Sequence, residues 1–256
     1  MEFIFDTHAH YDDPAFDADR FDFLKDLQNY GIKGIVNVGA DIKTSQLSIE
    51  YAERFNDVFA AVGMHPQNVG NLPDNYLDIL EKLAKKQRVV ALGEIGLDYH
   101  YDTVDKKLQQ RCFEEQLELA KNLNLPAIIH SRDAAEDTLG IIKNAKTPKF
   151  VVHCFSYSLE IAKRLIALDC YFGFTGVITF KNAKKSVEVL KELPLDRILV
   201  ETDCPYMAPE PNRGKRCDSS MLKFTVQKIA QVKEQQNSAM IEILNKNASE
   251  FYKINI

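Results

Sequence analysis

The stretch FIFDTHAH, residues 3–10, has the aromatic and β-branched composition of a β-strand and ends in two histidines that are one residue apart. Because side chains alternate between the two faces of a strand, Ile4 and Asp6 are expected on the face that carries the two histidines. If this face points into a barrel, the imidazoles of His8 and His10 lie side by side at its rim. The stretch therefore predicts a first strand that leads into a polar site.

Seven further segments have a similar composition, and segments with a helical spacing of apolar residues separate them. Phe21, Leu24 and Leu27 show this spacing between the first two strands. The rhythm of strands and helices predicts an α/β protein with the (β/α)8 fold, a TIM barrel, in a single domain over residues 1–256. The predicted strands are residues 3–10, 32–40, 58–66, 89–98, 125–133, 149–156, 170–180 and 197–205.

A doubly wound open sheet is the competing arrangement, but it usually has fewer strands and a glycine-rich first turn. Here the first turn, THAHYDDPAF at residues 7–16, has no glycine. Two further helices are predicted after the last strand, at about 219–235 and 238–252. No linker in this region marks a second domain.

The composition predicts a soluble globular protein, because 45% of the residues are hydrophobic and 27% are charged. The chain has no signal-peptide pattern and no apolar run near the roughly 20 residues of a membrane span, so a cytoplasmic location without membrane contact is expected. The five cysteines never form a CxxC pair, which disfavours a disulfide framework and a zinc knuckle. The net charge of -5 disfavours an extended contact with nucleic acid but allows a local phosphate site.

Histidines and acidic residues gather where the predicted strands end, which in a TIM barrel is the face that holds the active site. A single buried histidine is more often a hydrogen-bonded core residue than a ligand. The joint pattern, however, supplies nitrogen and oxygen donors that suit Zn, Mn, Co, Fe or Mg ions, and it predicts a metal site at the C-terminal face of the strands. The strand-end residues are His8, His10, His65, Glu94, His130, His153, Glu201 and Asp203.

Several neighbouring residues are expected to have other roles. His100 lies beyond the end of the fourth strand and is interpreted as a loop residue. Cys154 and Cys204 are expected to point into the barrel wall, because each directly follows a candidate ligand in the sequence. Metal-bound imidazoles usually donate their other N–H group to a carboxylate or a carbonyl, and Asp6 is the predicted acceptor.

The strand-end motifs resemble those of the TatD metal-dependent deoxyribonucleases, within the amidohydrolase-like metallo-barrels. The resemblance runs through nearly the whole chain in the ordered motifs FDTHAH, VGMHP, GEIGLDY, IHSRDA, VHCFS, FGFTGVITFKNA, ETDCPY and PNRGKR. It implies a hydrolase that uses two divalent metal ions to cleave phosphodiester bonds of DNA. An exonuclease of DNA repair or degradation, acting on ends or on single strands, is the expected form of this activity.

The resemblance also implies a ligand set. It assigns one ion to His8, His10, Glu94 and Asp203, and the other to Glu94, His130 and His153. Glu94 bridges the two ions, whose identity (Mg, Mn, Zn, Co, Fe or Ni) stays open. Two cations about 4 Å apart lower the pKa of a water molecule and neutralise charge on the attacked phosphate, and Asp203 is the expected general base.

Basic residues at the same face are expected to orient the phosphate. Arg132 follows His130 closely, and Arg213 and Arg216 lie in the loop after the eighth strand. His65 is similar to a family position near the substrate phosphate and is assigned to substrate binding. If the loop contacts DNA, replacing Arg213 or Arg216 raises KM and leaves the metal content unchanged. No protein partner is predicted.

The chain departs from the family pattern at three places, none of which is a proposed ligand. Gln67 stands where another histidine usually follows GMHP, and Tyr157 replaces a glycine after HCFS. Cys217, Asp218 and Ser219 replace Asn-Glu-Pro after RGKR. These departures concern the fit of the substrate and the shape of the rim.

Two other functions remain open. A hydrolase of the same metal class could act on another ester, a lactone or an amide, including an aminoacyl-tRNA ester. Many such barrels bridge their metals with a modified lysine at the end of the fourth strand, where this chain has Glu94, and this difference favours the nuclease. A catalytically silent binding protein is expected to have lost a ligand, whereas all six ligands are present.

Overall fold

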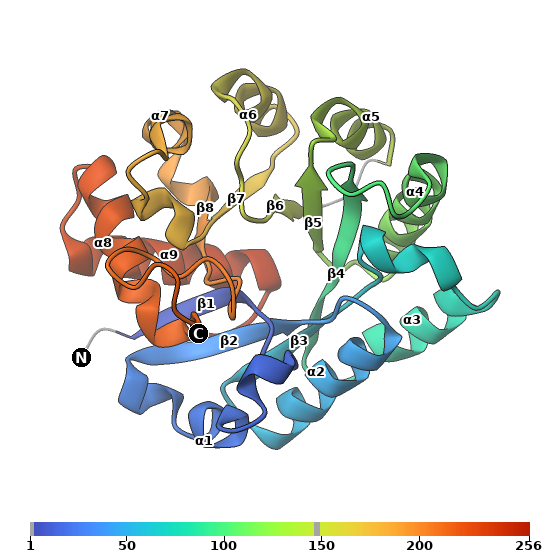
Figure 1. Ribbon diagram of the computed structural model, residues 1–256, viewed down its shortest axis with the longest axis horizontal. Coiled ribbons are helices and arrows are strands. Elements are labelled where there is room, and N and C mark those ends of the chain that lie inside the picture. Colours follow the sequence, from blue (N-terminus) through green and yellow to red (C-terminus); the bar gives the residue numbers. More distant parts are fainter. Residues whose placement is uncertain (1–2, 146–148) are drawn as a thin grey trace.

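Eight parallel strands form a single sheet in the computed structural model, which describes residues 3–145 and 149–256 (Figure 1). Each strand pairs in parallel with the next one along the chain. The segment after β8 meets the end of β1 through an isolated parallel bridge between Ala9 and Cys204, so the sheet closes almost completely. The strands are β1 (Ile4–Ala9), β2 (Ile32–Val38), β3 (Val58–Val62), β4 (Val89–Asp98), β5 (Ala127–Arg132), β6 (Phe150–Val152), β7 (Tyr171–Phe174) and β8 (Ile198–Val200).

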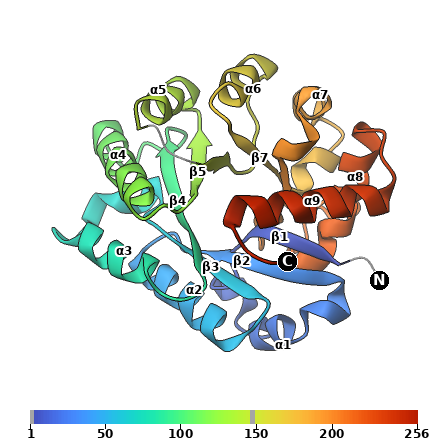
Figure 2. The same ribbon diagram turned by 180° about the vertical axis from the view of Figure 1, so that it is seen from behind.

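Helices alternate with the strands and form the outer layer of the barrel (Figures 1 and 2). This arrangement confirms the predicted (β/α)8 TIM barrel. In the described part of the chain, no helix is long and apolar enough to cross a membrane. The helices found there are α1 (Arg20–Lys25), α2 (Ile42–Arg54), α3 (Tyr76–Ala84), α4 (Lys106–Asn122), α5 (Ala135–Ala145), α6 (Leu159–Ile166), α7 (Lys184–Glu192), α8 (Leu222–Val232) and α9 (Asn237–Tyr252).

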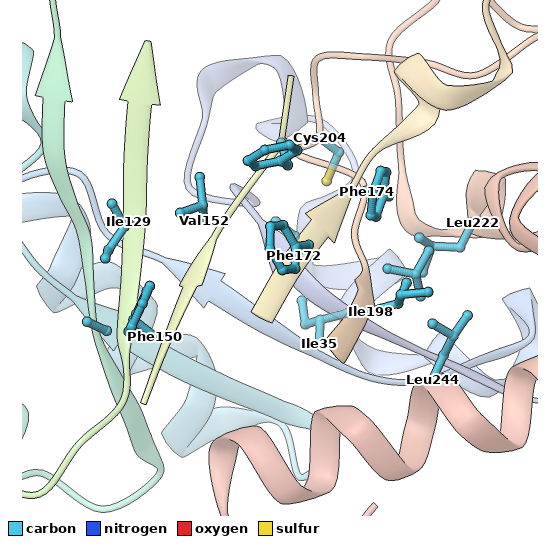
Figure 3. Packing of buried hydrophobic residues seen from close by; sticks show 14 of the residues in the cluster. Ile35, Ile129, Phe150, Val152, Phe172, Phe174, Ile198, Cys204, Leu222 and Leu244 are labelled. Carbon is cyan, nitrogen blue, oxygen red and sulfur yellow. The ribbon is translucent and has the colours of Figure 1, made fainter. Parts of the chain in front are cut away.

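Two hydrophobic clusters pack the barrel. The larger cluster joins the helices to the strands, and Figure 3 shows Phe172 of β7 and Leu244 of α9 within it. The smaller cluster contains residues from all eight strands, but among the described residues α9 is the only helix that contributes, through side chains such as Phe251 and Tyr252. α9 lies across β1 (Figures 1 and 2), so we infer that it closes one end of the barrel interior and leaves the carboxyl ends of the strands open.

The first strand does not keep the strict alternation that its sequence predicts. Ile4 packs in the larger cluster, whereas Phe5 packs in the smaller one. The pairing with β2 shifts between Asp6 and Ala9, and the carboxylate of Asp6 accepts a hydrogen bond from the backbone N–H of His8 at 3.3 Å. Irregularities of this kind redirect the side chains that follow. The expectation that Ile4 and Asp6 share a face with the two histidines is therefore wrong.

Four strands, β3, β6, β7 and β8, end at least four residues earlier than predicted. β7 ends at Phe174, because Thr175 caps a short 3-10 helix that directly follows. β8 ends at Val200, so Glu201 and Asp203 lie just beyond the strand. Asp203 has a φ angle of 55°, in the left-handed region that few residues other than glycine adopt. The local turn, rather than the alternation of a strand, thus sets the direction of this carboxylate.

Candidate metal centre

The carboxylate of Glu94 lies at the centre of the histidines at the mouth of the barrel. Glu94 belongs to β4 and is almost completely buried. Its Oε1 atom lies 2.7 Å from Nδ1 of His130 and 2.8 Å from Nε2 of His153. Its Oε2 atom lies 3.5 Å from Nε2 of His8 and 3.7 Å from Nε2 of His10. The two oxygens of one carboxylate therefore face two separate pairs of imidazoles.

Asp203 joins the pair formed by His8 and His10. Its Oδ1 atom lies 3.8 Å and 3.4 Å from their respective Nε2 atoms, which are themselves 3.0 Å apart. The backbone N–H of Asp203 donates to the carbonyl oxygen of His8 at 2.9 Å, which fixes this end of the barrel. Ligand atoms about 2.1 Å from a common ion lie about 3 Å from one another. The spacing of these three side chains therefore fits a shared cation.

In His10 and His130, a hydrogen-bond partner on the side of the ring away from Glu94 determines which ring nitrogen keeps its lone pair toward the centre. Nδ1 of His10 donates to the carbonyl oxygen of Val38 at 2.8 Å, which leaves the lone pair of the neutral ring on Nε2. Nε2 of His130 lies 3.2 Å from the carboxylate of Asp98, which favours a lone pair on Nδ1. Both lone pairs then point toward Glu94, as expected for ligands of metal ions.

His8 and His153 stack on one another, with ring centroids 4.2 Å apart. Among the described residues, the Nδ1 atoms of both rings are buried without a hydrogen-bond partner. Nδ1 of His153 lies 3.6 Å from Oε1 of Glu201, and that oxygen accepts the backbone N–H of Cys154 at 2.6 Å. The carboxylate of Glu201 also lies against the backbone of β7 at Gly173. A side chain at this position would displace it, because a Cβ atom there would lie 2.4 Å from Oε2 of Glu201. Glu201 therefore lies on the outer side of these ligands.

The structure thus brings all the predicted ligands together at one mouth of the barrel. Their nitrogen and oxygen donors form two groups joined by a single buried carboxylate, and this donor set fits two divalent cations. These ligands are His8, His10, Glu94, His130, His153 and Asp203.

The carboxylates of the centre attract positive charge, which can come either from protons on the imidazoles or from metal ions. Burial lowers the pKa of His10, but the carboxylates of Asp203 and Glu94 raise it to about 9. Burial raises the pKa of Glu94, yet the imidazoles of His153 and His65 hold it well below its usual range. The pKa of Asp203 is also lowered, because its contact with His10 outweighs burial. Both carboxylates are ionised near neutral pH and attract either imidazolium protons or metal ions.

His65 lies beside this group in a different orientation. It follows β3, and its Nδ1 atom accepts a hydrogen bond from the backbone N–H of Gln67 at 3.2 Å. Burial lowers its pKa to about 4, so the ring is neutral and carries its proton on Nε2. That nitrogen lies 3.6 Å from Oε1 of Glu94. His65 therefore presents a hydrogen-bond donor, rather than a lone pair, to the centre.

Two expectations about neighbouring residues are wrong. Asp6 does not face the ring of a ligand, because its buried carboxylate accepts hydrogen bonds from the hydroxyl of Ser219 at 2.6 Å and the backbone N–H of Thr202 at 3.0 Å. Cys154 is not turned into the wall, since it has a φ angle of 45° and lines a cavity next to the centre. Burial raises the pKa of its thiol to about 12, so the thiol stays neutral. Cys204 is buried, as expected.

The three predicted arginines occupy different positions. Arg132 is exposed and lines the cavity of the metal centre. Arg213 stacks on Phe180, with its guanidinium 4.4 Å from the ring centroid, and does not line that cavity. Arg216 forms two bonds to the carboxylate of Asp19, at 2.8 Å and 2.6 Å, which attach its loop to the segment after β1. Of the three, the structure brings only Arg132 to the cavity.

Asp98 is the residue of this site that reasoning from the sequence missed. It is the last residue of β4, is 2% exposed and contacts His130. The sequence does contain a signal for it, because a carboxylate ends an otherwise apolar strand within the same motif, GEIGLDY, as Glu94. Its partner could not be read from the sequence, since His130 lies on the neighbouring strand.

A TIM barrel whose C-terminal mouth gathers side chains that could hold metal ions defines a class, the metal-dependent hydrolase barrels. Comparison with known proteins narrows the class to a family. The family model described as TatD related DNase matches residues 5–253. The chain belongs to the TatD family, and it is a metal-dependent hydrolase.

Relatives and solved structures agree with this assignment. The chain is 40% identical to "Uncharacterized metal-dependent hydrolase YabD" from Bacillus subtilis, over 98% of this chain and 100% of that protein. It is 34% identical to "Uncharacterized metal-dependent hydrolase YcfH" from Escherichia coli K12, over 98% and 96% of the two chains. The crystal structure of YJJV, a TatD homolog from Escherichia coli K12, matches with a TM-score of 0.93, at 30% identity and 98% coverage of each chain.

The departures from the family pattern lie around the rim and behind the ligands. Gln67 lines the cavity of the metal centre. The hydroxyl of Tyr157 lies 2.9 Å from that of Ser131, at the end of β5. Ser219 supports Asp6 through its hydroxyl. These side chains shape the surroundings of the centre and leave its ligands unchanged.

Proposed function

We propose that the protein is a deoxyribonuclease that uses two divalent cations to cleave phosphodiester bonds at DNA ends or in single strands. The observation that carries this proposal is Glu94, whose two carboxylate oxygens face two groups of predicted ligands, because a carboxylate in this position could serve two cations at once. The family description, TatD related DNase, supports DNA as the substrate. The net charge of -5 supports contact with a short stretch of DNA rather than the wrapping of a long duplex.

The six ligands would hold the cations in two groups that share Glu94, with the β1 histidines and Asp203 in one group and His130 and His153 in the other. When bound, two divalent cations supply an activated water at neutral pH and neutralise charge on the phosphate. The remaining tasks fall to side chains that orient the substrate and move protons.

Asp203 is placed to act as the general base. It is ionised, its side chain is 13% exposed, and it borders the open cavity of the centre. A carboxylate in this position can accept the proton of the attacking water. His65 has the opposite role, because its Nε2–H group can donate a hydrogen bond to a phosphate oxygen. Arg132, exposed at the rim, offers a planar set of donors that suits a phosphate group.

Digestion of labelled single-stranded and duplex oligonucleotides with Mg²⁺, Mn²⁺ or Zn²⁺ tests this function. We expect metal-dependent shortening of end-labelled strands by the wild type. Asp203→Asn should lower kcat by about 100-fold or more, because the amide cannot accept the proton. Asp196→Asn is the matched control, since Asp196 is 65% exposed and lies outside the centre. Failure to cleave any nucleic acid with any of these metals would contradict the proposal.

Other substrates of the same metal class are tested on the same preparation. They are carboxylic esters, lactones, amides and aminoacyl-tRNA esters. Metal-dependent turnover of one of these, with no cleavage of DNA, would reassign the substrate and leave the metal centre as described.

A further inference from the structure

A second cavity, of about 260 Å³, opens beside the metal centre at the carboxyl ends of β5, β6, β7 and β8. It shares His130, Arg132, His153 and Asp203 with the cavity of the metal centre. A ligand held at the cations can therefore extend directly into it. The cleavage chemistry itself gives this second cavity no role.

The walls of the second cavity are apolar and partly aromatic. Phe155, Phe174 and Ile178 line it, and each is at most 4% exposed. Phe155 packs edge to face against Phe172, with ring centroids 5.0 Å apart, so its ring is held in place. Such a wall favours the flat face of an aromatic or heteroaromatic ring over a charged group.

Two hydroxyl groups interrupt the apolar lining. Ser156, which is exposed, and Ser186, which is half-buried, both line the second cavity, and within residues 3–145 and 149–256 neither hydroxyl has a hydrogen-bond partner in the protein. A hydroxyl can both donate and accept, so it can bind the polar edge of a ring. An alkyl group in the cavity would shield the half-buried hydroxyl of Ser186 from water without offering it a partner, which is unfavourable. The lining is therefore better matched to a heteroaromatic ring than to a hydrocarbon chain.

Positive charge borders the second cavity. Arg132 lies at the rim that it shares with the metal centre. Lys181, Lys184 and Lys185 do not line the cavity, but they are exposed on the segment that leads from β7 into α7, and the same segment supplies Ser186. A ring site next to cations and metal ligands matches the chemistry of a nucleotide, in which a base and a phosphate are joined by a sugar.

We propose that the second cavity binds the base of the nucleotide next to the phosphate that is cleaved. This inference rests on the proposed function. A base that packs its face against Phe155 and Phe174 cannot also stay stacked and paired in a duplex, so the base must leave the helix before cleavage. Single strands and frayed ends should therefore be preferred. Because the two hydroxyls can donate or accept, little discrimination between the four bases is expected.

Binding of reaction products to the Mn²⁺-loaded protein, measured by calorimetry, tests the proposal. We expect 2′-deoxyadenosine 5′- or 3′-monophosphate to bind about tenfold or more tightly than 2-deoxyribose 5-phosphate, which lacks the base. Ser186→Trp should abolish this difference by filling the cavity from α7, while binding of the sugar phosphate stays unchanged. Glu188→Trp is the matched control, because Glu188 is exposed on the same helix and does not line the cavity.

The metal content and melting temperature of each variant show whether the centre and the fold are intact, and Ser186→Leu replaces the tryptophan variant if the latter does not fold. Equal binding of nucleotide and sugar phosphate by the wild type would overturn the base site, as would an unchanged difference in the folded Ser186 variant. DNA cleavage by the same wild-type sample would show that only the base site is wrong. A wild type that binds the base but cleaves no DNA would instead overturn the proposed function.

Discussion

Asp98 and Val38 lie outside the predicted ligand set, yet their contacts favour one nitrogen of a neighbouring imidazole as the one that faces the centre. The carbonyl of Val38 accepts from Nδ1 of His10, and the carboxylate of Asp98 lies 3.2 Å from Nε2 of His130. An imidazole without such a partner can rotate or change its tautomer, and both changes remove the lone pair from the cation. Ligand identity alone therefore does not define the centre.

Asp98→Ala is expected to weaken metal binding about 10- to 100-fold, because His130 loses its outer acceptor. Competition with a chromogenic chelator measures the affinity. Asp98→Asn keeps an oxygen acceptor and should retain most of it. Unchanged affinity in the alanine variant would contradict the role of Asp98, and an equal loss in both variants would show that the charge matters rather than the acceptor.

Metal affinity is expected to fall as the pH falls. Burial lowers the pKa values of His10 and His130, but the carboxylates beside these rings outweigh burial and raise both, that of His10 to about 9. Protons and cations compete for the same nitrogens, so the affinity should rise with pH until about 9 and lose its dependence above that value. Titrations of the protein with Zn²⁺ in buffers between about pH 6 and pH 9 measure this dependence. A flat profile across the range would contradict it.

His65→Ala should raise KM for an oligonucleotide about tenfold, because a hydrogen bond from Nε2–H to a charged oxygen is lost. The metal content should not change, since the accepting Nδ1 leaves no lone pair on the nitrogen that faces Glu94. Steady-state kinetics and metal analysis of the same sample measure the two quantities. A loss of bound metal would instead make His65 a ligand.

The end of β1 depends on hydrogen bonds from segments near the other end of the chain. The carboxylate of Asp6, which is fully buried, accepts from the backbone and the hydroxyl of Thr202 after β8. It also accepts from Ser219, just before α8. The same carboxylate accepts the backbone N–H of His8, where the pairing with β2 shifts. Asp6 thus connects β1 to the segment after β8 and to the segment before α8, next to the predicted ligands His8 and His10.

Asp6→Ala is expected to lower the free energy of unfolding by about 3 kcal/mol, because Thr202 and Ser219 keep buried donors without an acceptor. Urea unfolding measures the change. Asp17→Ala, which removes an exposed carboxylate beside Arg20, should cost less than about 1 kcal/mol and serves as the control. A similar small cost for both variants would contradict the structural role of Asp6.

The order of strands and helices could be predicted from the sequence, because periods of 2 and 3.6 residues are local properties. α8 also lies within its predicted range, and α9 begins one residue before its own. The ends of β7 and β8 could not be predicted, since the cap formed by Thr175 and the φ angle of Asp203 follow from turns that interrupt apolar runs. The shift in β1 was equally hidden, because it depends on the contacts of Asp6 with distant residues.

The predicted ligands could be selected from the sequence because, apart from Glu94, they lie close to or just beyond strand ends, and the fold brings those ends together. Glu94 lies four residues before the end of β4. Contacts between exposed side chains were not predictable. Arg216 lies in the same motif, PNRGKR, as Arg213. Its guanidinium, however, binds the carboxylate of Asp19, which is far away in the sequence. The contact between Asp98 and His130 could not be predicted either, because it depends on β5 lying next to β4.

The predicted ligands lie within or just beyond β1, β4, β5, β6 and β8. These strands belong to one barrel (Figure 1). Closure between β8 and β1 brings Asp203 beside His8, although the two residues lie near opposite ends of the chain. α9 packs its Phe251 and Tyr252 among side chains of the strands, in the smaller cluster. One end of the barrel is therefore filled with apolar side chains, and the other is available for cations and substrate.

Anomalous diffraction from crystals of the wild-type protein grown with Mn²⁺ tests the central claim most directly. We predict two peaks on opposite sides of the Glu94 carboxylate, one nearest the two β1 histidines and Asp203 and the other nearest His130 and His153. A single peak, or peaks that do not share Glu94, would contradict the two-cation centre.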